Sequence, residues 1–297
     1  DMMLWLVEMR YKGLSKIRKV FSKKEIDYVN HGGYEIIPSV NDERYSELEW
    51  QIKWLNKALS RITGVKKVYR FANDKIDEFG LADVGHIIEN ELEGALHPGK
   101  LCDALLRLVQ TMGVNVLSGL SIEGYEENNN EIKLYTDRGV TLRSEQLLIC
   151  TNGFARQLLP QLDVKPARGQ ILVTSPIPSL KLKGTFHYDE GFYYFRNIGK
   201  RLLVGGARNM AIDDETTTEM EITDQIQQTL EQFVSKHILP GQPFEITDRW
   251  SGIMGVGAEK MPIIKRVSPK IFCAVKMSGM GVALAPVAAD TITDMMK

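Results

Sequence analysis

IFCAV, KMSGMG and VALAP follow one another at residues 271–275, 276–281 and 282–286. The first run predicts a buried strand, and the residues after the glycines predict a helix. Gly279 and Gly281 let the bare backbone of the intervening turn approach a ligand. Peptide N–H groups at the start of a helix, reinforced by the aligned dipoles, favour an electron-rich group. The stretch therefore predicts an acceptor site, although Gly-x-Gly here is also typical of a plain tight connection.

A second candidate turn follows the apolar run LLIC at residues 147–150. This run predicts a buried strand that leads directly into Thr151, Asn152 and Gly153. In open α/β sheets a cofactor usually binds where such a parallel strand ends in small polar and glycine residues. We therefore expect part of a cofactor site here.

The rest of the chain mixes helix and strand patterns. Apolar residues spaced by three and four from Leu4 to Ile17 predict an N-terminal helix. Pro98 and Gly113 mark the start and the end of another helix. Residues 197–200 predict a four-residue hairpin connection. Further helices are expected at 43–59, from 222 and after 281, and strands at 34–37, 114–117, 120–125, 131–136, 140–142, 168–174, 191–196, 201–206 and 244–254.

The composition is that of a globular protein, and the length predicts two domains. The 297 residues are 43% hydrophobic and 25% charged, and they exceed the usual size of one domain. A formal charge of −1, from 37 basic and 38 acidic residues, provides no basic field for a nucleic-acid partner. The longest apolar runs are too short to cross a bilayer. We expect a soluble, cytoplasmic protein without a transmembrane segment.

The cysteines and histidines favour neither a disulfide framework nor a metal site. Cys102, Cys150 and Cys273 lie far apart, each in an apolar stretch that is typical of core packing in a reducing compartment. The five histidines lack the close spacing that a zinc site needs. We therefore expect no bound metal.

Eight short blocks occur in an order that is more specific than any one of them. They are GALHPGKL (94–101), LICTNG (148–153), RGQI (168–171), YYFR (193–196), LLVGG (202–206), WSG (250–252), MPII (261–264) and GMGV (279–282). In this order they resemble the D-amino-acid oxidase superfamily of FAD-dependent oxidoreductases, in the branch of glycine oxidases, sarcosine oxidases and γ-glutamylputrescine oxidase-like proteins. The resemblance covers nearly the whole chain.

This resemblance implies a mixed α/β (α+β) fold of two interleaved lobes. An incomplete, Rossmann-like FAD-binding lobe would comprise residues 94–160 and 256–297, and an antiparallel-sheet substrate lobe would comprise 1–93 and 161–255. Family members pass a hydride equivalent from a C–N bond to the flavin, and oxygen often reoxidises it. The implied cofactor is FAD and the implied substrate is an amine or amino acid, with the oligomeric state left open.

The resemblance also carries candidate residues onto this sequence. Residues 279–283 would lie against the pyrimidine edge of the flavin, and Ile122 near the adenine. Strand alternation lets only one of Tyr193 and Tyr194 face the substrate, and the alignment favours Tyr193. The cofactor-binding candidates are Ile122, Thr151, Asn152, Gly153, Gly279, Met280, Gly281, Val282 and Ala283, and the catalytic candidates are Tyr193, Tyr194, Arg196 and Lys260.

Two departures from the family pattern limit these expectations. Family members open with a strand and a Gly-x-Gly-x-x-Gly turn that cradles the pyrophosphate, and residues 1–297 contain no such motif. The chain instead opens within a helical pattern, as a fragment does. Glycine oxidases place carboxylate-binding arginines near the positions of Met254 and Gly279, so an α-amino acid held by such a fork is disfavoured.

Two other function classes stay open at this point. One is a cofactor-free binding or scaffold protein that keeps the substrate lobe without redox chemistry. The other is a flavoprotein dehydrogenase of a non-amine substrate such as a polyol phosphate. Flavin absorbance separates the first from an oxidoreductase, and a substrate screen separates the second.

Overall fold

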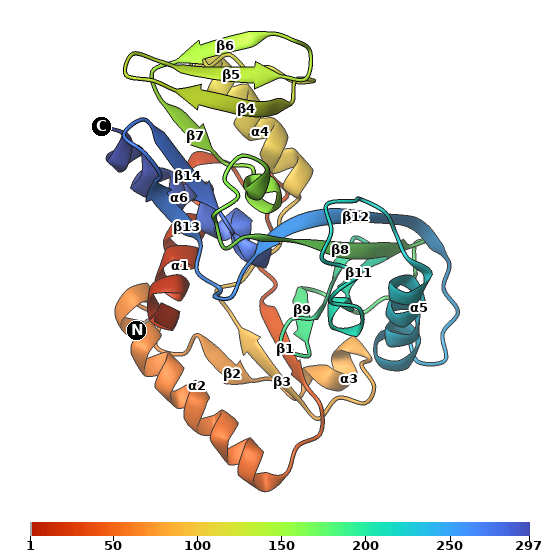
Figure 1. The fold of residues 1–297 in the computed structure, drawn as a ribbon. Coiled ribbons are helices and arrows are strands. Elements are labelled where there is room, and N and C mark those ends of the chain that lie inside the picture. The colour runs from red at the N-terminus through yellow and green to blue at the C-terminus, as the bar shows by residue number, and fades with distance from the viewer. Residues whose placement is uncertain (1) are drawn as a thin grey trace.

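One eight-stranded sheet dominates the computed structural model, which describes residues 2–297 (Figure 1). Its order is β12-β8-β11-β10-β9-β1-β3-β2, and every neighbouring pair is antiparallel except β1 and β9. The strands are β1 (Gly33–Ile37), β2 (Tyr69–Phe71), β3 (His86–Asn90), β8 (Lys165–Thr174), β9 (Thr185–Tyr188), β10 (Tyr193–Ile198), β11 (Arg201–Gly206) and β12 (Ile246–Val256). The fold is mixed α/β, as the sequence predicts.

Two of the helices cover one face of this sheet and bury the main core there. Alternate side chains of the strands point to that face and meet α3 (Lys75–Phe79) and α5 (Asp224–Phe233). The largest core cluster forms there, with Phe186 stacked on Phe195 at a centroid distance of 4.8 Å. Leu230 of α5 belongs to the same cluster and is fully buried. We call this side the covered face of the sheet, and the opposite side the site face.

A three-stranded sheet contains the strand that leads into the glycine turn. β14 (Ile271–Val275) is completely buried, pairs antiparallel with β13 (Ile263–Arg266) and parallel with β7 (Leu147–Ile149). The chain leaves β14 through a short turn and enters α6 (Gly281–Met296). The predicted strand, turn and helix are thus confirmed. A separate sheet holds β4 (Ile122–Glu127), β5 (Ile132–Thr136) and β6 (Thr141–Ser144).

The two long N-terminal helices lie on different parts of the molecule. α1 (Met2–Val20) packs so closely on α6 that a Cβ atom at Gly13 would lie 1.8 Å from the carbonyl oxygen of Ala283. α2 (Asp42–Thr63) instead places Leu48 and Ile52 against Ile88 of β3. The expected helices at 4–17 and 43–59 are confirmed. The N-terminal range therefore contacts both the large sheet and the C-terminal helix.

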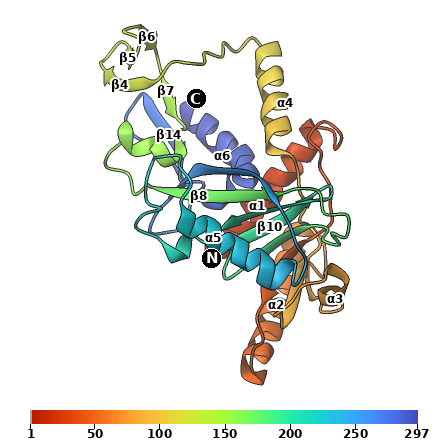
Figure 2. The ribbon, with the colours of Figure 1, turned by 90° about the vertical axis from the view of Figure 1, so that its right-hand side faces the viewer.

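Helix α4 (Pro98–Thr111) begins at the predicted residue, and several of its leucines are exposed to solvent. Pro98 lies in its first turn, and the ring of His97 caps it by accepting a hydrogen bond from the Lys100 amide at 3.3 Å. The predicted strand at 114–117 is wrong: these residues form no strand and run with other loop residues from α4 to β4 (Figure 2). The exposed apolar residues of this region are Leu105, Leu106, Leu108, Met112, Val114, Val116 and Leu117.

Several smaller expectations are corrected. Ile198 pairs with Arg201, so the hairpin connection has two residues and not four. Cys102 and Cys150 are exposed, and only Cys273 packs in the core. Among residues 2–297 no helix is both long and apolar enough to span a bilayer. The same residues contain no group of three or more His, Cys, Asp or Glu side chains arranged to hold a metal ion.

Candidate functional site

The glycine turn between β14 and α6 presents open backbone. Lys276 and Ser278 have φ values of 62° and 50°, and the one-turn 3-10 segment Ser278–Met280 leads into the helix. A Cβ atom at Gly279 would meet nothing within 4 Å, and this glycine is exposed. The first amides of α6 have no partner within the helix, and its first turn carries no acidic residue. The turn can therefore accept an electron-rich group from outside.

The second candidate turn holds the first one in place. Asn152 adopts a left-handed conformation with φ 44°, and its side-chain oxygen accepts a hydrogen bond from the Met277 amide at 3.0 Å. A Cβ atom at Gly153 would lie 2.7 Å from the carbonyl oxygen of Met254, and one at Gly255 would lie 2.8 Å from the Asn152 side-chain oxygen. Three separate segments thus meet here because the glycines leave room for each other's backbone.

Tyr194 lies on the site face of the large sheet. Its ring crosses Gly205, where a Cβ atom would lie 2.5 Å from the ring. Its hydroxyl oxygen lies 3.4 Å from the Cβ position of Gly169, and the Met254 methyl lies 3.3 Å from the same position. Burial raises the pKa of Tyr194 to about 12. The hydroxyl makes no hydrogen bond with any residue in the range 2–297, so it stays protonated and free to donate.

Tyr193 lies on the covered face, which corrects the preference for it. Its ring stacks on Phe233 of α5 at a centroid distance of 4.5 Å, and only 8% of the residue is exposed. Adjacent strand residues point to opposite sides, and the core residue Phe195 shares the side of Tyr193. Tyr194 is therefore the member of the pair that faces the site.

Arg196 shares the site face with Tyr194, but it already has backbone partners. Its guanidinium donates to the carbonyl oxygen of Leu96 at 2.8 Å and to that of Asn197 at 3.2 Å. Burial lowers its pKa from the usual value. The first contact ties the segment before α4 to the large sheet, so we assign Arg196 a supporting role in the geometry.

Glu35 and His187 form a titratable pair that the sequence reasoning missed. They are register partners on β1 and β9, and their Oε2 and Nδ1 atoms are 3.8 Å apart. Burial, with the charges of Glu93 and Glu190, raises the pKa of Glu35 to about 7, and Lys260 opposes this shift. Lys260 therefore acts electrostatically on Glu35. A lone carboxylate inside the apolar strand GYEII was the signal available in the sequence.

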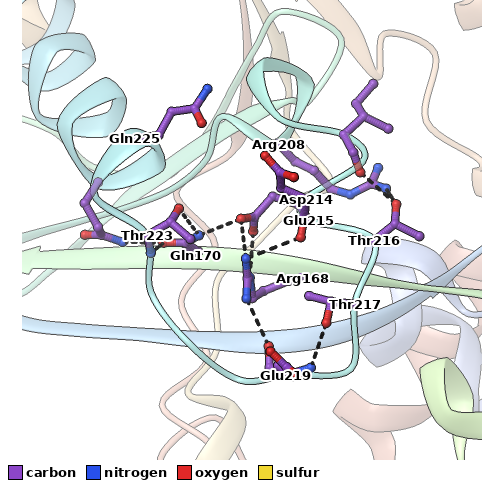
Figure 3. Close-up of polar contacts among 12 residues, drawn as sticks. Arg168, Gln170, Arg208, Asp214, Glu215, Thr216, Thr217, Glu219, Thr223 and Gln225 are labelled. Carbon is purple, nitrogen blue, oxygen red and sulfur yellow. Dashed lines mark hydrogen bonds and ion pairs between the residues drawn. The ribbon is translucent and has the colours of Figure 1, made fainter.

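On the covered face of the large sheet, a buried polar network fixes the long loop that follows β11. Arg168 forms a bidentate pair with Glu215 at 3.0 and 2.7 Å, and the Gln170 amide donates to the same carboxylate at 2.9 Å (Figure 3). Arg168 also donates to the carbonyl oxygens of Asp214 and Glu219. Because Arg168 and Gln170 alternate with Gly169, this network lies on the covered face and supports β8 from behind.

The structure brings together some of the predicted residues and separates others. Asn152 and Gly153 meet Met254 and Gly255, and Asn152 also binds the amide of Met277, two residues before Gly279. Thr151 is exposed directly before Asn152, and Val282 is 45% exposed at the start of α6. Ile122 begins β4 in a different sheet, and Lys260 lies in the loop between β12 and β13. Whether these residues contact a cofactor stays a prediction.

Comparisons with known proteins show related sequences and a shared fold. The probable oxidoreductase OrdL of Rhizobium meliloti is 27% identical over 215 residues, covering 70% of this chain and 46% of that protein. The structure resembles L-proline dehydrogenase from P. horikoshii, with a TM-score of 0.80, 17% identity, and coverage of 98% of this chain and 78% of the other. It also resembles glycine oxidase from Geobacillus kaustophilus, with a TM-score of 0.78 and 16% identity. That match covers 98% of this chain and 77% of the other.

The chain spans less than half the length of the curated relatives that it matches. The model of the FAD-dependent oxidoreductase family called DAO matches residues 5–295, which is nearly the whole sequence. The chain therefore belongs to the DAO family of FAD-dependent oxidoreductases.

Proposed function

We propose that this chain forms the flavin-ring and substrate part of an oxidoreductase that acts on the C–N bond of an amine or amino acid. The observation that carries this proposal is the exposed glycine turn at the start of α6, linked through Met254 to the unpartnered hydroxyl of Tyr194. In this proposal the electron acceptor and the polar substrate contact would lie on neighbouring elements. Structures with the same fold include an L-proline dehydrogenase, a glycine oxidase and an L-amino acid deaminase, whose names are those of enzymes that act on amino acids.

The residues present fit an FAD isoalloxazine ring. Gly279 leaves space where any other residue would place a side chain, and the first amides of the following helix α6 have no partner within the helix and no carboxylate in the first turn. Residues 279–283 would hold the pyrimidine edge, while Asn152 keeps the turn in shape through Met277. When bound, FAD supplies the acceptor for the hydride equivalent. Peptide N–H groups would stabilise the negative charge of its reduced ring.

Tyr194 supplies the substrate contact in this proposal. With a pKa of about 12, the hydroxyl remains protonated at neutral pH and can donate a hydrogen bond to a substrate carboxylate or accept one from an amine. The surrounding Gly205 and Met254 hold the ring in a poorly solvated place, where a hydrogen bond to a charged group is strengthened. Tyr194 therefore orients the substrate and leaves proton removal to another group.

The site favours an amine over an α-amino acid. The two positions that align with carboxylate-binding arginines are occupied by Met254 and Gly279, neither of which carries a charge. Arg196 already donates to two backbone carbonyl oxygens. A bidentate clamp on an α-carboxylate is therefore not provided by these residues. Within the proposed reaction class we rank amines lacking an α-carboxylate first.

A flavin titration followed by a substrate screen tests this function. Purified protein should quench FAD fluorescence saturably, and the loaded protein should consume oxygen, or reduce a dye acceptor, with amines. Hydroxy acids and polyol phosphates serve as the competing substrate class. Activity confined to them would replace the amine proposal by a dehydrogenase of non-amine substrates. If FAD does not bind saturably, a cofactor-free binding role for residues 1–297 is favoured, in line with the lack of Gly-x-Gly-x-x-Gly.

A further inference from the structure

Lys276 is an unusual residue for the first position of the glycine turn. It has φ 62°, a left-handed backbone conformation that is strained for a residue other than glycine. Only 5% of the residue is exposed, although lysine is rarely buried unless it is paired. Its ammonium lies 3.5 Å from the carboxylate of Asp163. A glycine at this position would avoid the backbone strain. We therefore look to the lysine side chain and its contacts for a role.

The carboxylate of Asp163 joins this lysine to a second loop. Its Oδ2 atom, which faces Lys276, also accepts a hydrogen bond from the Ala258 amide at 3.0 Å. A Cβ atom at Gly257 would lie 2.7 Å from that oxygen and 2.7 Å from Cδ of Lys276. Gly257 thus permits the lysine chain, the aspartate and the loop backbone to meet. One carboxylate connects the end of β14 with the start of the 257–262 loop.

We propose that Lys276 and Asp163 are positioning residues that clamp the 257–262 loop to the glycine turn. The ammonium orients the Asp163 carboxylate, and the carboxylate holds the Ala258 amide. The loop carries Lys260, whose charge acts on Glu35 across the site face. The clamp therefore couples the backbone that would hold the flavin to the loop whose Lys260 charge opposes the raised pKa of Glu35. Its role in catalysis rests on the proposed function, whereas its geometry does not.

The other side of the turn strengthens this assignment. Asn152 fixes the Met277 amide by a separate hydrogen bond at 3.0 Å. Two consecutive turn residues are thus held from two different segments, Lys276 by Asp163 and Met277 by Asn152. Since Asn152 already anchors the turn itself, we expect loss of the clamp to release the 257–262 loop and leave the turn in place.

Amide hydrogen exchange at Ala258 tests the clamp without any cofactor. Lys276→Met is the informative variant because it leaves the acceptor of the Ala258 hydrogen bond in place. We expect exchange of this amide to accelerate about tenfold, the loss of a modest charge-assisted hydrogen bond. Asp163→Ala, which removes the acceptor, should give at least the same acceleration. Lys276→Arg should keep the protection, and Lys265→Met, at an exposed lysine on β13, is the matched control.

The double variant and FAD affinity complete the test. If Lys276 acts through Asp163, the double variant should exchange no faster at Ala258 than Asp163→Ala alone. In a fluorescence titration, both single variants and Lys265→Met should bind FAD with the affinity of the unaltered protein, because Asn152 keeps the turn in place. Unchanged Ala258 exchange in Lys276→Met, or full additivity, would overturn the clamp. Absence of FAD binding to the unaltered protein would overturn the proposed function and leave the exchange result decisive for the clamp.

Discussion

Tyr193 and Tyr194 are neighbours in sequence but belong to opposite faces of the large sheet. Tyr193 stacks on Phe233 of α5 inside the main core. Tyr194 lies across Gly205 on the site face, with a hydroxyl that has no hydrogen-bond partner among residues 2–297. Because side chains alternate along a strand, one residue of register decides which of the two packs in the core and which faces the proposed site.

The contrast extends along both faces. The covered face holds Phe186, Phe195 and the helix α5, packed in one apolar cluster. The site face holds Glu35 and His187 in the same cross-strand row as Tyr194. Packing free energy is therefore concentrated on one side of the sheet, and groups with free polar atoms on the other. Substitutions that separate stability from chemistry test this division.

Truncation of an aromatic core residue should have the largest effect. Phe186 is fully buried between Tyr34 and Phe195, so Phe186→Ala should lower the free energy of unfolding by about 3–5 kcal/mol. The matched variant is Trp250→Ala, since Trp250 lies on β12 in the row of the site face and is 43% exposed. It should cost less than about 1 kcal/mol. Urea unfolding followed by circular dichroism measures both, and equal losses would refute the division.

Removal of a buried charge should come second. Glu215 is 1% exposed and takes hydrogen bonds from Arg168 and Gln170, so Glu215→Ala leaves the Arg168 guanidinium buried without its counter-charge. We expect a loss of about 3 kcal/mol in unfolding free energy. Glu219→Ala is the control, because only the backbone carbonyl of Glu219 contacts Arg168. Similar stabilities of the two variants in thermal unfolding would show that the network contributes little.

Much of the fold could be predicted from local patterns. The strand, turn and helix at 271–296 carry their information in consecutive residues: an apolar run, two glycines and an apolar helix. Pro98 and His97 likewise mark a helix start through backbone chemistry that requires no distant partner. Such elements are predictable because the physical cause lies within the segment.

Elements that depend on a distant surface were less predictable. Residues 114–117 have an apolar pattern typical of a buried strand, but in residues 2–297 no strand pairs with them. The leucines of α4 show the same problem, since an amphipathic pattern predicts a covered face without specifying the cover. By contrast, Ile226 and Leu230 of α5 do meet the large sheet.

The candidate site likewise contains parts that local sequence predicts and parts that depend on distant segments. The glycine turn was visible in the sequence, because glycine between a strand and a helix has a local meaning. The choice between Tyr193 and Tyr194 required the register of β10, and the Asp163 contact joins segments more than 90 residues apart. Long-range contacts of single polar atoms have no periodic pattern, so they emerge only with the fold.

Loss of one hydroxyl on the site face should affect turnover and leave stability nearly unchanged. In FAD-loaded protein, Tyr194→Phe should lower kcat/KM for the preferred amine about tenfold, the effect of one hydrogen bond of about 1.4 kcal/mol. Unfolding free energy should change by less than about 0.5 kcal/mol, because the hydroxyl has no partner within residues 2–297. Tyr193→Phe is the matched control and should leave kcat/KM unaltered. A larger kinetic effect in Tyr193→Phe would reverse the assignment of the faces.

The smallest effect should be a pH dependence of stability that belongs to Glu35. Its pKa rises from 4.5 to about 7 through burial and the neighbouring Glu93 and Glu190, against the opposing charge of Lys260. The folded protein thus binds this proton more tightly than the unfolded chain. The resulting stabilisation is complete below pH 4.5 and is lost as the pH rises through about 7.

Solvent screening limits this contribution because 39% of the Glu35 side chain is exposed, so we expect about 1 kcal/mol. Glu35→Gln stays neutral at every pH and should lack this contribution to the pH dependence. The free energy of unfolding of the unaltered protein should therefore fall relative to that of the variant between pH 4.5 and about 7. Burial lowers the pKa of His187 from its usual value, and this histidine is present in both proteins. Parallel pH profiles would mean that Glu35 is as well solvated as a surface carboxylate, and the site face would then be more open than its raised pKa implies.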